Sequence, residues 1–220
     1  METNESLIIL LNNLSRAIIN FPNCNWTDAF SKGQLVSKLW LITELKKLDL
    51  DLGVVFVCAG WVGTLPMLMF EDGKLNYKYI RSFDIDPTCA DAADTLNRLA
   101  VKDGWKFKAT TMDVNQLTYD DYFSYQTKKY DGSLQTVVDS VDTIINTSCD
   151  HIAPFDKWWD LIPKKKLVVL QNNDSKLDND HVNNISSLSD MKAQAPMSKI
   201  LYEGVLPLDN YNRYMLIGRK

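Results

Sequence analysis

The spacing of apolar residues changes several times along this chain, and each change predicts a new element. In the first fifty residues apolar positions recur every three or four residues, as at Leu35 and Leu39, which predicts amphipathic helices over 6–20 and 33–48. The next apolar stretch, "VVFVC" from Val54, is uninterrupted, as is typical of a strand buried on both faces. The pattern therefore predicts helices first and strands after them.

Short apolar runs then alternate with segments of helical spacing. We expect strands at 53–58, 79–83, 105–110, 140–146 and 167–170. We expect helices at 65–70, 87–99, 117–125, 155–161 and 182–192. Strands that alternate with helices in this way predict a parallel sheet covered by helices on both faces.

The C-terminal segment departs from this alternation. "SKILYEGVLPLDNYNRYMLIG" holds two strand-like runs joined by 207–212, with no helix between them, which predicts an antiparallel hairpin. The expected fold is α/β, with a doubly wound, mostly parallel, Rossmann-like sheet and this hairpin at its end. We expect an N-terminal helical cap over 1–50 and one compact α/β domain over 51–220.

Composition restricts the class of protein further. A chain of 220 residues with 45% hydrophobic content can bury one sizeable core, and its net charge of −4 argues against general nucleic-acid binding. The four cysteines form no CxxC pair, which fits a reducing compartment. The N-terminal segment lacks the basic region of a signal peptide, and no apolar run is long enough to span a membrane. We therefore expect a cytoplasmic protein with no membrane partner. Whether it forms a homodimer is left open.

The first predicted strand ends in "CAGWVGTL", where Gly60 and Gly63 flank Trp61. Ligands of doubly wound sheets bind beyond the carboxyl ends of the strands, where the strand order reverses. The two glycines either admit a ligand to the backbone or merely allow a tight turn.

Two acids follow the next two predicted strands. Asp84 lies roughly twenty residues after the glycines, where an acid can accept hydrogen bonds from a ribose. Asp113 follows the third strand, where an acid can accept from an adenine amino group. Together these positions indicate an adenosine-containing ligand.

At these motifs the chain resembles the class I S-adenosylmethionine-dependent methyltransferases. The segments "VCAGWVGTL", "FDIDP" and "MDV" stand where that superfamily has its first three motifs. The sheet of that superfamily also ends in an antiparallel hairpin like the one predicted here. "SKGQLVSKLWL", "NTSCDH" and "QNND" are similar to methyltransferase-like proteins of large tailed phages. The resemblance covers about residue 34 to the end. It implies S-adenosylmethionine as the cofactor and, for a phage protein, the host cytoplasm as the location.

The resemblance implies cofactor-binding roles at the three motifs and in the N-terminal segment. These residues are Gly60, Trp61, Gly63, Asp84, Ile85, Asp113, Val114 and Gln34. The superfamily usually has an acid near the end of its first strand, where this chain has Val57 and Cys58. Gln34, Ser37 or Lys38 would then reach the methionine part of the cofactor; the alternative is a surface helix turn.

Polar residues after the fourth and fifth predicted strands indicate the acceptor region. We expect catalytic roles for His151, Asp150 and Asn146. We expect substrate-binding roles for Thr147, Ser148, Asn172 and His181. Both histidines follow an aspartate, and the alternative for each is a helix cap or a surface position. The two Asp-His pairs leave a bound metal open as an alternative, but we expect none, because the chain has no HxH or HxxxH spacing.

Three functions fit this sequence. The first is a methyltransferase that acts on a small molecule or another acceptor; "NTSCDH" differs from the NPPY-type motif of enzymes that methylate base amino groups. The second is transfer of the cofactor's aminocarboxypropyl group. The third is a non-catalytic binding or assembly protein with the cofactor fold. The unusual first motif is the reason for keeping the last two.

Overall fold

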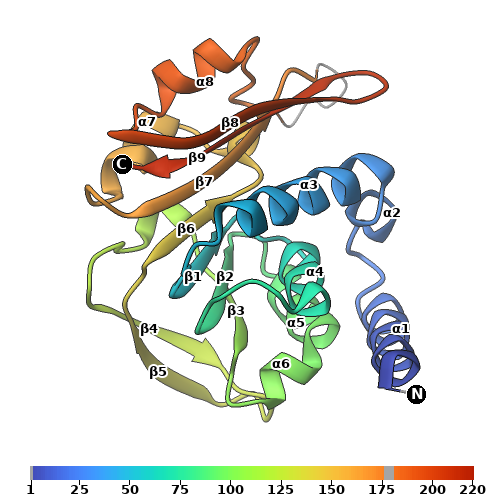
Figure 1. Ribbon diagram of the computed structural model, residues 1–220. Coiled ribbons are helices and arrows are strands. Elements are labelled where there is room, and N and C mark those ends of the chain that lie inside the picture. The colour runs from blue at the N-terminus through green and yellow to red at the C-terminus, as the bar shows by residue number, and fades with distance from the viewer. Residues whose placement is uncertain (1, 176–180) are drawn as a thin grey trace.

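The central element of the protein is a seven-stranded sheet with the order β3-β2-β1-β6-β7-β9-β8. The computed structural model describes residues 2–175 and 181–220 (Figure 1). The strands of this sheet are β1 (Val54–Cys58), β2 (Tyr79–Asp84), β3 (Phe107–Thr111), β6 (Thr143–Asn146), β7 (Leu167–Asn173), β8 (Lys199–Pro207) and β9 (Asn212–Arg219). The first five pair in parallel, and β9 pairs antiparallel with both β7 and β8. The predicted parallel sheet and terminal hairpin are therefore confirmed.

The strand order reverses between β1 and β6, which are neighbours in the sheet but distant in the chain. In their register Cys58 lies beside Asn146, so both strands end at the same level. A crevice for a ligand is expected beyond this pair of strand ends. The sheet thus places the glycine-containing loop after β1 next to the polar loop after β6.

Side chains that alternate along the strands enter two cores, one on each face of the sheet. Val55 and Val57 pack on one side, against α3 (Lys32–Leu48), α4 (Thr64–Asp72) and α5 (Cys89–Leu96). Phe56 and Cys58 pack on the other side, against α7 (Phe155–Leu161) and α8 (Leu188–Gln194). Full burial of an aliphatic or aromatic side chain stabilises the fold by about 1.5–3 kcal/mol, so both faces contribute.

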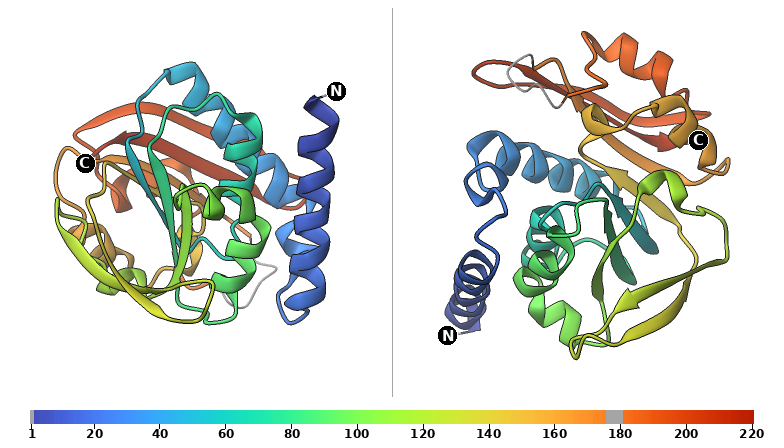
Figure 2. Two further views of the ribbon diagram at one scale, coloured as in Figure 1. Left: turned by 90° about the horizontal axis from the view of Figure 1, so that it is seen from below. Right: turned by 180° about the vertical axis from the view of Figure 1, so that it is seen from behind.

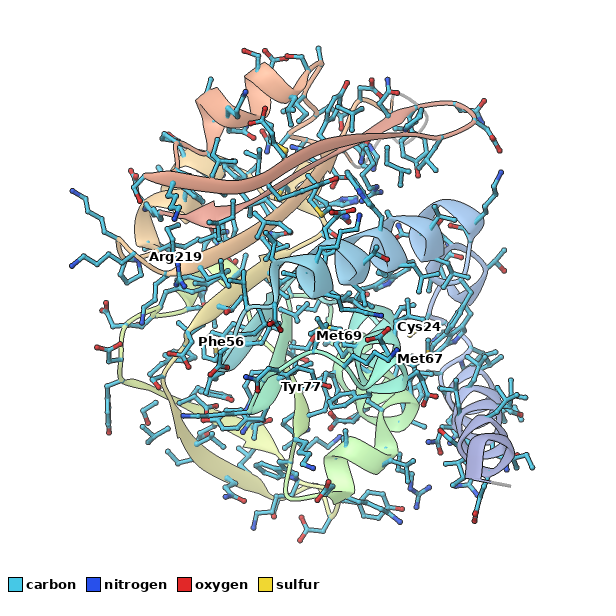
Figure 3. All side chains as sticks on the ribbon, viewed as in Figure 1. Cys24, Phe56, Met67, Met69, Tyr77 and Arg219 are labelled. Atoms are coloured by element: carbon cyan, nitrogen blue, oxygen red, sulfur yellow. The ribbon has the colours of Figure 1, made fainter. Side chains whose placement is uncertain are left out.

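The N-terminal helices form a third, smaller core. Ala17 of α1 (Glu2–Asn20), Cys24 of the following turn and Trp26 of α2 (Trp26–Ala29) pack with side chains of α4 and α5. Figure 2 shows α1 on the outside of the molecule beside α5. Cys24 and Met67, which both belong to this third core, are labelled in Figure 3. Helix α3 instead packs directly on the sheet. The division of the chain at residue 50 stays a prediction.

The predicted helix over 117–125 is wrong. The chain forms the short helix η1 (Val114–Gln116) and then an antiparallel ribbon of β4 (Phe123–Lys128) and β5 (Leu134–Asp139). Along β4 buried and exposed residues alternate, as in a strand with one covered face. The ribbon is held by Asp139, which accepts from Arg81 Nε at 2.9 Å and from Tyr125 Oη at 2.7 Å.

Two other predicted helices are confirmed only in part. The segment 87–99 divides into α5 and α6 (Arg98–Lys102) at Asn97, whose side chain donates to Gly63 O and Ala93 O. In the segment 182–192 the helix begins only at Leu188, where the Ser187 side chain caps it. Within the part of the chain that the structure describes, no helix combines the length and the apolar character needed to cross a membrane.

Candidate functional site

The turn from β1 into α4 has an unusual backbone. Ala59 and Trp61 have left-handed φ angles of 51° and 50°, and Gly63 follows at 75°. Left-handed conformations cost non-glycine residues on the order of 1–3 kcal/mol each and persist only when neighbouring groups hold them. Asp84 is one such group, because its Oδ2 accepts from the Trp61 N–H at 2.7 Å. The end of β2 therefore positions the first loop.

The two glycines of this loop are required by packing inside the protein. A Cβ on Gly60 would lie 2.0 Å from Ser82 Oγ, and one on Gly63 would lie 2.7 Å from Asn97 Nδ2 and 3.0 Å from Ala93 Cβ. Both directions lead into β2 and α5. The tight turn and close packing, rather than the approach of a ligand, account for the missing Cβ atoms, and the glycines' cofactor role stays a prediction.

We expect Gly60→Ala to lower the free energy of unfolding by about 1–3 kcal/mol, the range for overpacking a filled interior. The reason is the contact of the added Cβ with Ser82 Oγ. Chemical denaturation measures the change. In a Ser82→Ala background the same substitution should cost less, and equal costs in both backgrounds would contradict this explanation.

Two carboxylates lie beyond β2 and β3. Asp84 accepts the Trp61 N–H through Oδ2 and the Asp86 N–H through Oδ1, at 2.7 and 3.0 Å. Burial raises the pKa of Asp84, and these two hydrogen bonds oppose the shift. Asp113 caps η1 through Oδ1, which accepts from the N–H and the side chain of Asn115. Each carboxylate keeps lone pairs for further donors.

The neighbours of these two acids differ in exposure. The side chain of Ile85 is 69% exposed, which is unusual for isoleucine, whereas Val114 is buried in the core on the α7 side. Ile85 therefore offers an apolar surface beside Asp84. Val114 can contribute to a ligand site only through its backbone.

A group of three ionisable side chains, here called the Asp150 cluster, lies beyond β6 and β7. It consists of Asp150, His151 and His181. The first two belong to the short helix η2 (Cys149–His151), and His181 follows β7. Oδ2 of Asp150 lies 2.9 Å from Nε2 of His181 and 3.5 Å from Nε2 of His151, and the imidazole centroids are 4.9 Å apart. The fold thus brings together three predicted site residues from two loops.

The charge of Asp150 is stabilised although the side chain is buried. Burial by itself would raise the pKa of Asp150, but the hydrogen bond from His181 and the positive charge of Arg213 outweigh it and lower the pKa. His151 is the exposed member, with 42% of its side chain accessible, and it also acts electrostatically on Asp84. His151 is therefore the member of the Asp150 cluster that also acts on the carboxylate beyond β2.

Other predicted acceptor residues have mainly buried positions. Asn146 is fully buried; its Oδ1 accepts from the Ser148 N–H at 2.8 Å, and its Nδ2 has no partner among the described residues. Thr147 is also buried, and its carbonyl accepts from Arg213. The Asn172 amide donates to Asn183 O and accepts from the next N–H, so it holds the loop after β7. Residues 176–180 of the predicted polar run lie outside the described residues.

Lys38 and Arg213 are two buried cations near the Asp150 cluster. Lys38 is hydrogen-bonded to Gln34, and burial together with the charge of Arg213 lowers the pKa of Lys38 to about 7. Nη1 of Arg213 donates to Thr147 O at 3.0 Å, whereas its Nε has no partner among the described residues. The sequence interpretation missed Arg213. Its signal is a single charge inside the strand-like run "YNRYMLIG".

Helix α3 and the β8–β9 hairpin reach this site from the same side. Figure 1 shows the β8–β9 turn above the N-terminal end of α3, where Lys32 pairs with Asp209 at 3.2 Å. Gln171 at the end of β7 donates to Ser37 O at 2.9 Å, which ties α3 to the sheet. The N-terminal segment therefore lies against the carboxyl end of β7, and the contact of Gln34, Ser37 or Lys38 with the cofactor stays a prediction.

A cavity of about 890 Å³ lies elsewhere, at the amino ends of the strands. Its lining includes Gly53 before β1, Thr143 at the start of β6, and Arg219, labelled at the left of Figure 3. None of the predicted site residues lines it. Doubly wound sheets bind ligands at the carboxyl ends of their strands, whereas this cavity lies at the amino ends, so it is not part of the candidate site.

Comparisons with known proteins find solved structures of similar fold. No protein-family model matches this chain, and no curated protein matches it. Magnesium protoporphyrin IX methyltransferase (ChlM) from Synechocystis PCC 6803 with bound SAH is 13% identical, with 89% of this chain and 92% of that chain covered and a TM-score of 0.56. The same enzyme with bound SAM is 15% identical, with 84% and 76% covered and a TM-score of 0.52.

A third solved structure is similar over nearly the whole chain. The PH0226 protein from Pyrococcus horikoshii OT3 is 14% identical, with 93% of this chain and 97% of that chain covered and a TM-score of 0.55. At such low identity a likeness shows the fold alone. Together with the sheet order and the terminal hairpin, it shows that this chain has the fold of the class I S-adenosylmethionine-dependent methyltransferases.

Proposed function

We propose that this protein is an S-adenosylmethionine-dependent methyltransferase that acts on a small-molecule acceptor. The observation that carries the proposal is the set of polar side chains after β2, β3 and β6, which lie at the carboxyl ends of the parallel strands around the reversal of strand order between β1 and β6. The likeness to a methyltransferase solved with SAM and with SAH supports it. The residues present must then fit both halves of this cofactor.

The adenosine half fits the acids after β2 and β3. Each Asp84 oxygen accepts one backbone N–H, which leaves lone pairs for two ribose hydroxyls. The exposed Ile85 side chain would pack against the adenine ring. Asp113 accepts both of its described hydrogen bonds through Oδ1, so Oδ2 would accept from the adenine amino group.

The methionine half fits the buried donors around β6. Arg213 Nε and Asn146 Nδ2 have no partner among the described residues, and Lys38 is a buried amine near them. Leaving a buried donor unsatisfied costs on the order of 1–3 kcal/mol, which the carboxylate of the cofactor would remove. Cys58, at the position of the superfamily's usual acid, instead contacts Tyr119 Oη at 3.3 Å inside the core.

The main task of the protein in methyl transfer is to position the acceptor relative to the cofactor. The bound cofactor supplies an electrophilic methyl group on a sulfonium. The loops after β1 and β6 would hold the acceptor atom in line with that methyl group and exclude water. His151, which is exposed and lies beside the buried Asp150, would take the proton from an amine or hydroxyl acceptor.

Calorimetry with S-adenosylmethionine and S-adenosylhomocysteine tests the proposal first. We expect both to bind, and absence of binding at millimolar concentration would contradict the proposal. Mass spectrometry of the product tests the reaction. S-adenosylhomocysteine indicates methyl transfer, whereas methylthioadenosine would indicate aminocarboxypropyl transfer.

We expect Lys38→Met to stabilise the fold while it weakens cofactor binding. In the folded protein the pKa of Lys38 is about 7, against 10.5 for an ordinary lysine. Between these pH values the unfolded chain binds more protons, so Lys38 makes the free energy of unfolding rise with pH in this window. Methionine removes both the buried charge and this dependence.

Thermal denaturation at about pH 6 and about pH 9 measures the stability change, and calorimetry measures the affinity. The matched control is Lys32→Met on the same helix, because the Lys32 side chain is 73% exposed. We expect little change in the control. A Lys38→Met variant that binds the cofactor as tightly as the wild type would remove Lys38 from the methionine site.

A further inference from the structure

The spacing of the Asp150 cluster matches that of metal ligands. One ligand atom from each of Asp150, His151 and His181 lies within 4.8 Å of the other two. Asp150 Oδ2 is 2.9 Å from His181 Nε2 and 3.5 Å from His151 Nε2. Two ligand atoms about 2.0–2.1 Å from a tetrahedral ion lie about 3.3 Å apart. We propose that these three side chains bind a divalent transition-metal ion.

The donor set selects the class of ion. Two imidazoles with one carboxylate suit zinc, iron(II), cobalt(II) and nickel(II), whereas magnesium and calcium prefer oxygen ligands alone. Three protein ligands also leave a position open, as in catalytic zinc sites, where the fourth ligand is water or substrate. His151 is the exposed ligand, so the open position faces the accessible side.

Supporting hydrogen bonds hold the buried ligand and join the two loops. Asn173 Nδ2 donates to Asp150 Oδ2 at 2.8 Å, and the N–H groups of Val182 and Asn183 donate to Asp150 O at 2.9 Å. The Asn183 side chain also donates to Cys149 O at 2.9 Å. Such outer contacts orient the ligands of metal sites. Asp150 Oδ1 is buried without a partner among the described residues, so the carboxylate has this second oxygen available to the ion beside Oδ2.

Nearby charges set the expected strength of this site. The positive charge of Arg213 helps keep Asp150 ionised, which is the form that binds a cation, and Lys38 also interacts electrostatically with Asp150. The same two positive groups repel a divalent ion. The ion must also displace the hydrogen bond between His181 and Asp150. We therefore expect affinity in the micromolar range, weaker than that of a structural zinc site.

An ion here would bind an oxygen or nitrogen atom of the acceptor beside His151. This role rests on the proposed function, whereas the binding of the ion does not. With the ion bound, His151 is a ligand rather than a base. Activity measured with and without the ion therefore shows whether His151 acts as a metal ligand or as a base.

The test uses the full chain after treatment with a chelator. Cobalt(II) absorption and zinc calorimetry should both give one equivalent of bound metal, without a thiolate-to-cobalt band, because the four cysteines are not ligands. His151→Ala and His181→Ala should each weaken binding by at least about tenfold. The control is Asp121→Asn, because the Asp121 carboxylate is 94% exposed and lines the cavity at the amino ends of the strands, opposite the cluster. It should bind metal as the wild type does.

Equal affinity in the wild type and both histidine variants, or a thiolate band, would overturn the proposal. Circular dichroism checks the fold of each variant, and His151 is exposed enough to tolerate alanine. Cofactor binding is measured on the same metal-free protein. Metal binding without cofactor binding would contradict only the proposed function, and the reverse would contradict only the metal site.

Discussion

Asp84→Ala is expected to weaken S-adenosylmethionine binding about 5- to 150-fold, which corresponds to about 1–3 kcal/mol for lost partners of buried donors. The carboxylate has two tasks in the proposed complex. It would accept the ribose hydroxyls, and it already accepts the Trp61 N–H at 2.7 Å. Without it, the loop that holds Ala59 and Trp61 at left-handed φ angles loses a restraint. Both effects act in the same direction.

The matched control for this variant is Asp86→Ala. Asp86 lies two residues further on, and its carboxylate accepts from the N–H and hydroxyl of Thr88 at the start of α5. We expect the control to retain wild-type affinity in calorimetry. A folded Asp84→Ala variant with unchanged affinity would place the ribose contact at another residue.

His151→Ala is expected to lower turnover at least about tenfold, within the usual range for one positioned acid–base group. His151 is the exposed member of the Asp150 cluster, so an acceptor can reach it. Cofactor affinity should change little, because the ribose and adenine contacts come from the loops after β2 and β3. The effect should therefore fall on kcat.

The measurement follows transfer from methyl-labelled S-adenosylmethionine into a cell metabolite extract. The chelator-treated wild type provides the comparison. If His151 is a base, chelation leaves wild-type turnover unchanged; if it is a ligand, chelation lowers wild-type turnover to that of the variant. Equal turnover in variant and wild type would make His151 a surface residue, and Asn146 and Asp150 would remain as candidates.

The sheet itself was predictable because its signals are local. The run "VVFVC" is apolar at every position, and the structure buries every residue of β1. Asp84 and Asp113 could be selected as candidate site residues because an acid that follows a buried parallel strand lies at the carboxyl end of the sheet, where ligands bind. The segment 117–125 misled the prediction because its apolar residues, among them Leu117, Tyr119 and Phe123, fit both helical and strand spacing. The distant partner Arg81 holds the ribbon that forms there through Asp139.

Outside the β4–β5 ribbon, local pattern alone determined the order of strands and helices, the terminal hairpin and the positions of the polar loops, since periodicity reports which side of each element is buried. The tertiary structure decided the rest. It showed that Gly60 makes room for Ser82, and it brought His151 and His181 to one carboxylate although they are thirty residues apart. It also brought Arg213 from the last strand to the loop after β6. Such contacts depend on which strands become neighbours in the sheet, and spacing along the chain carries no information about that.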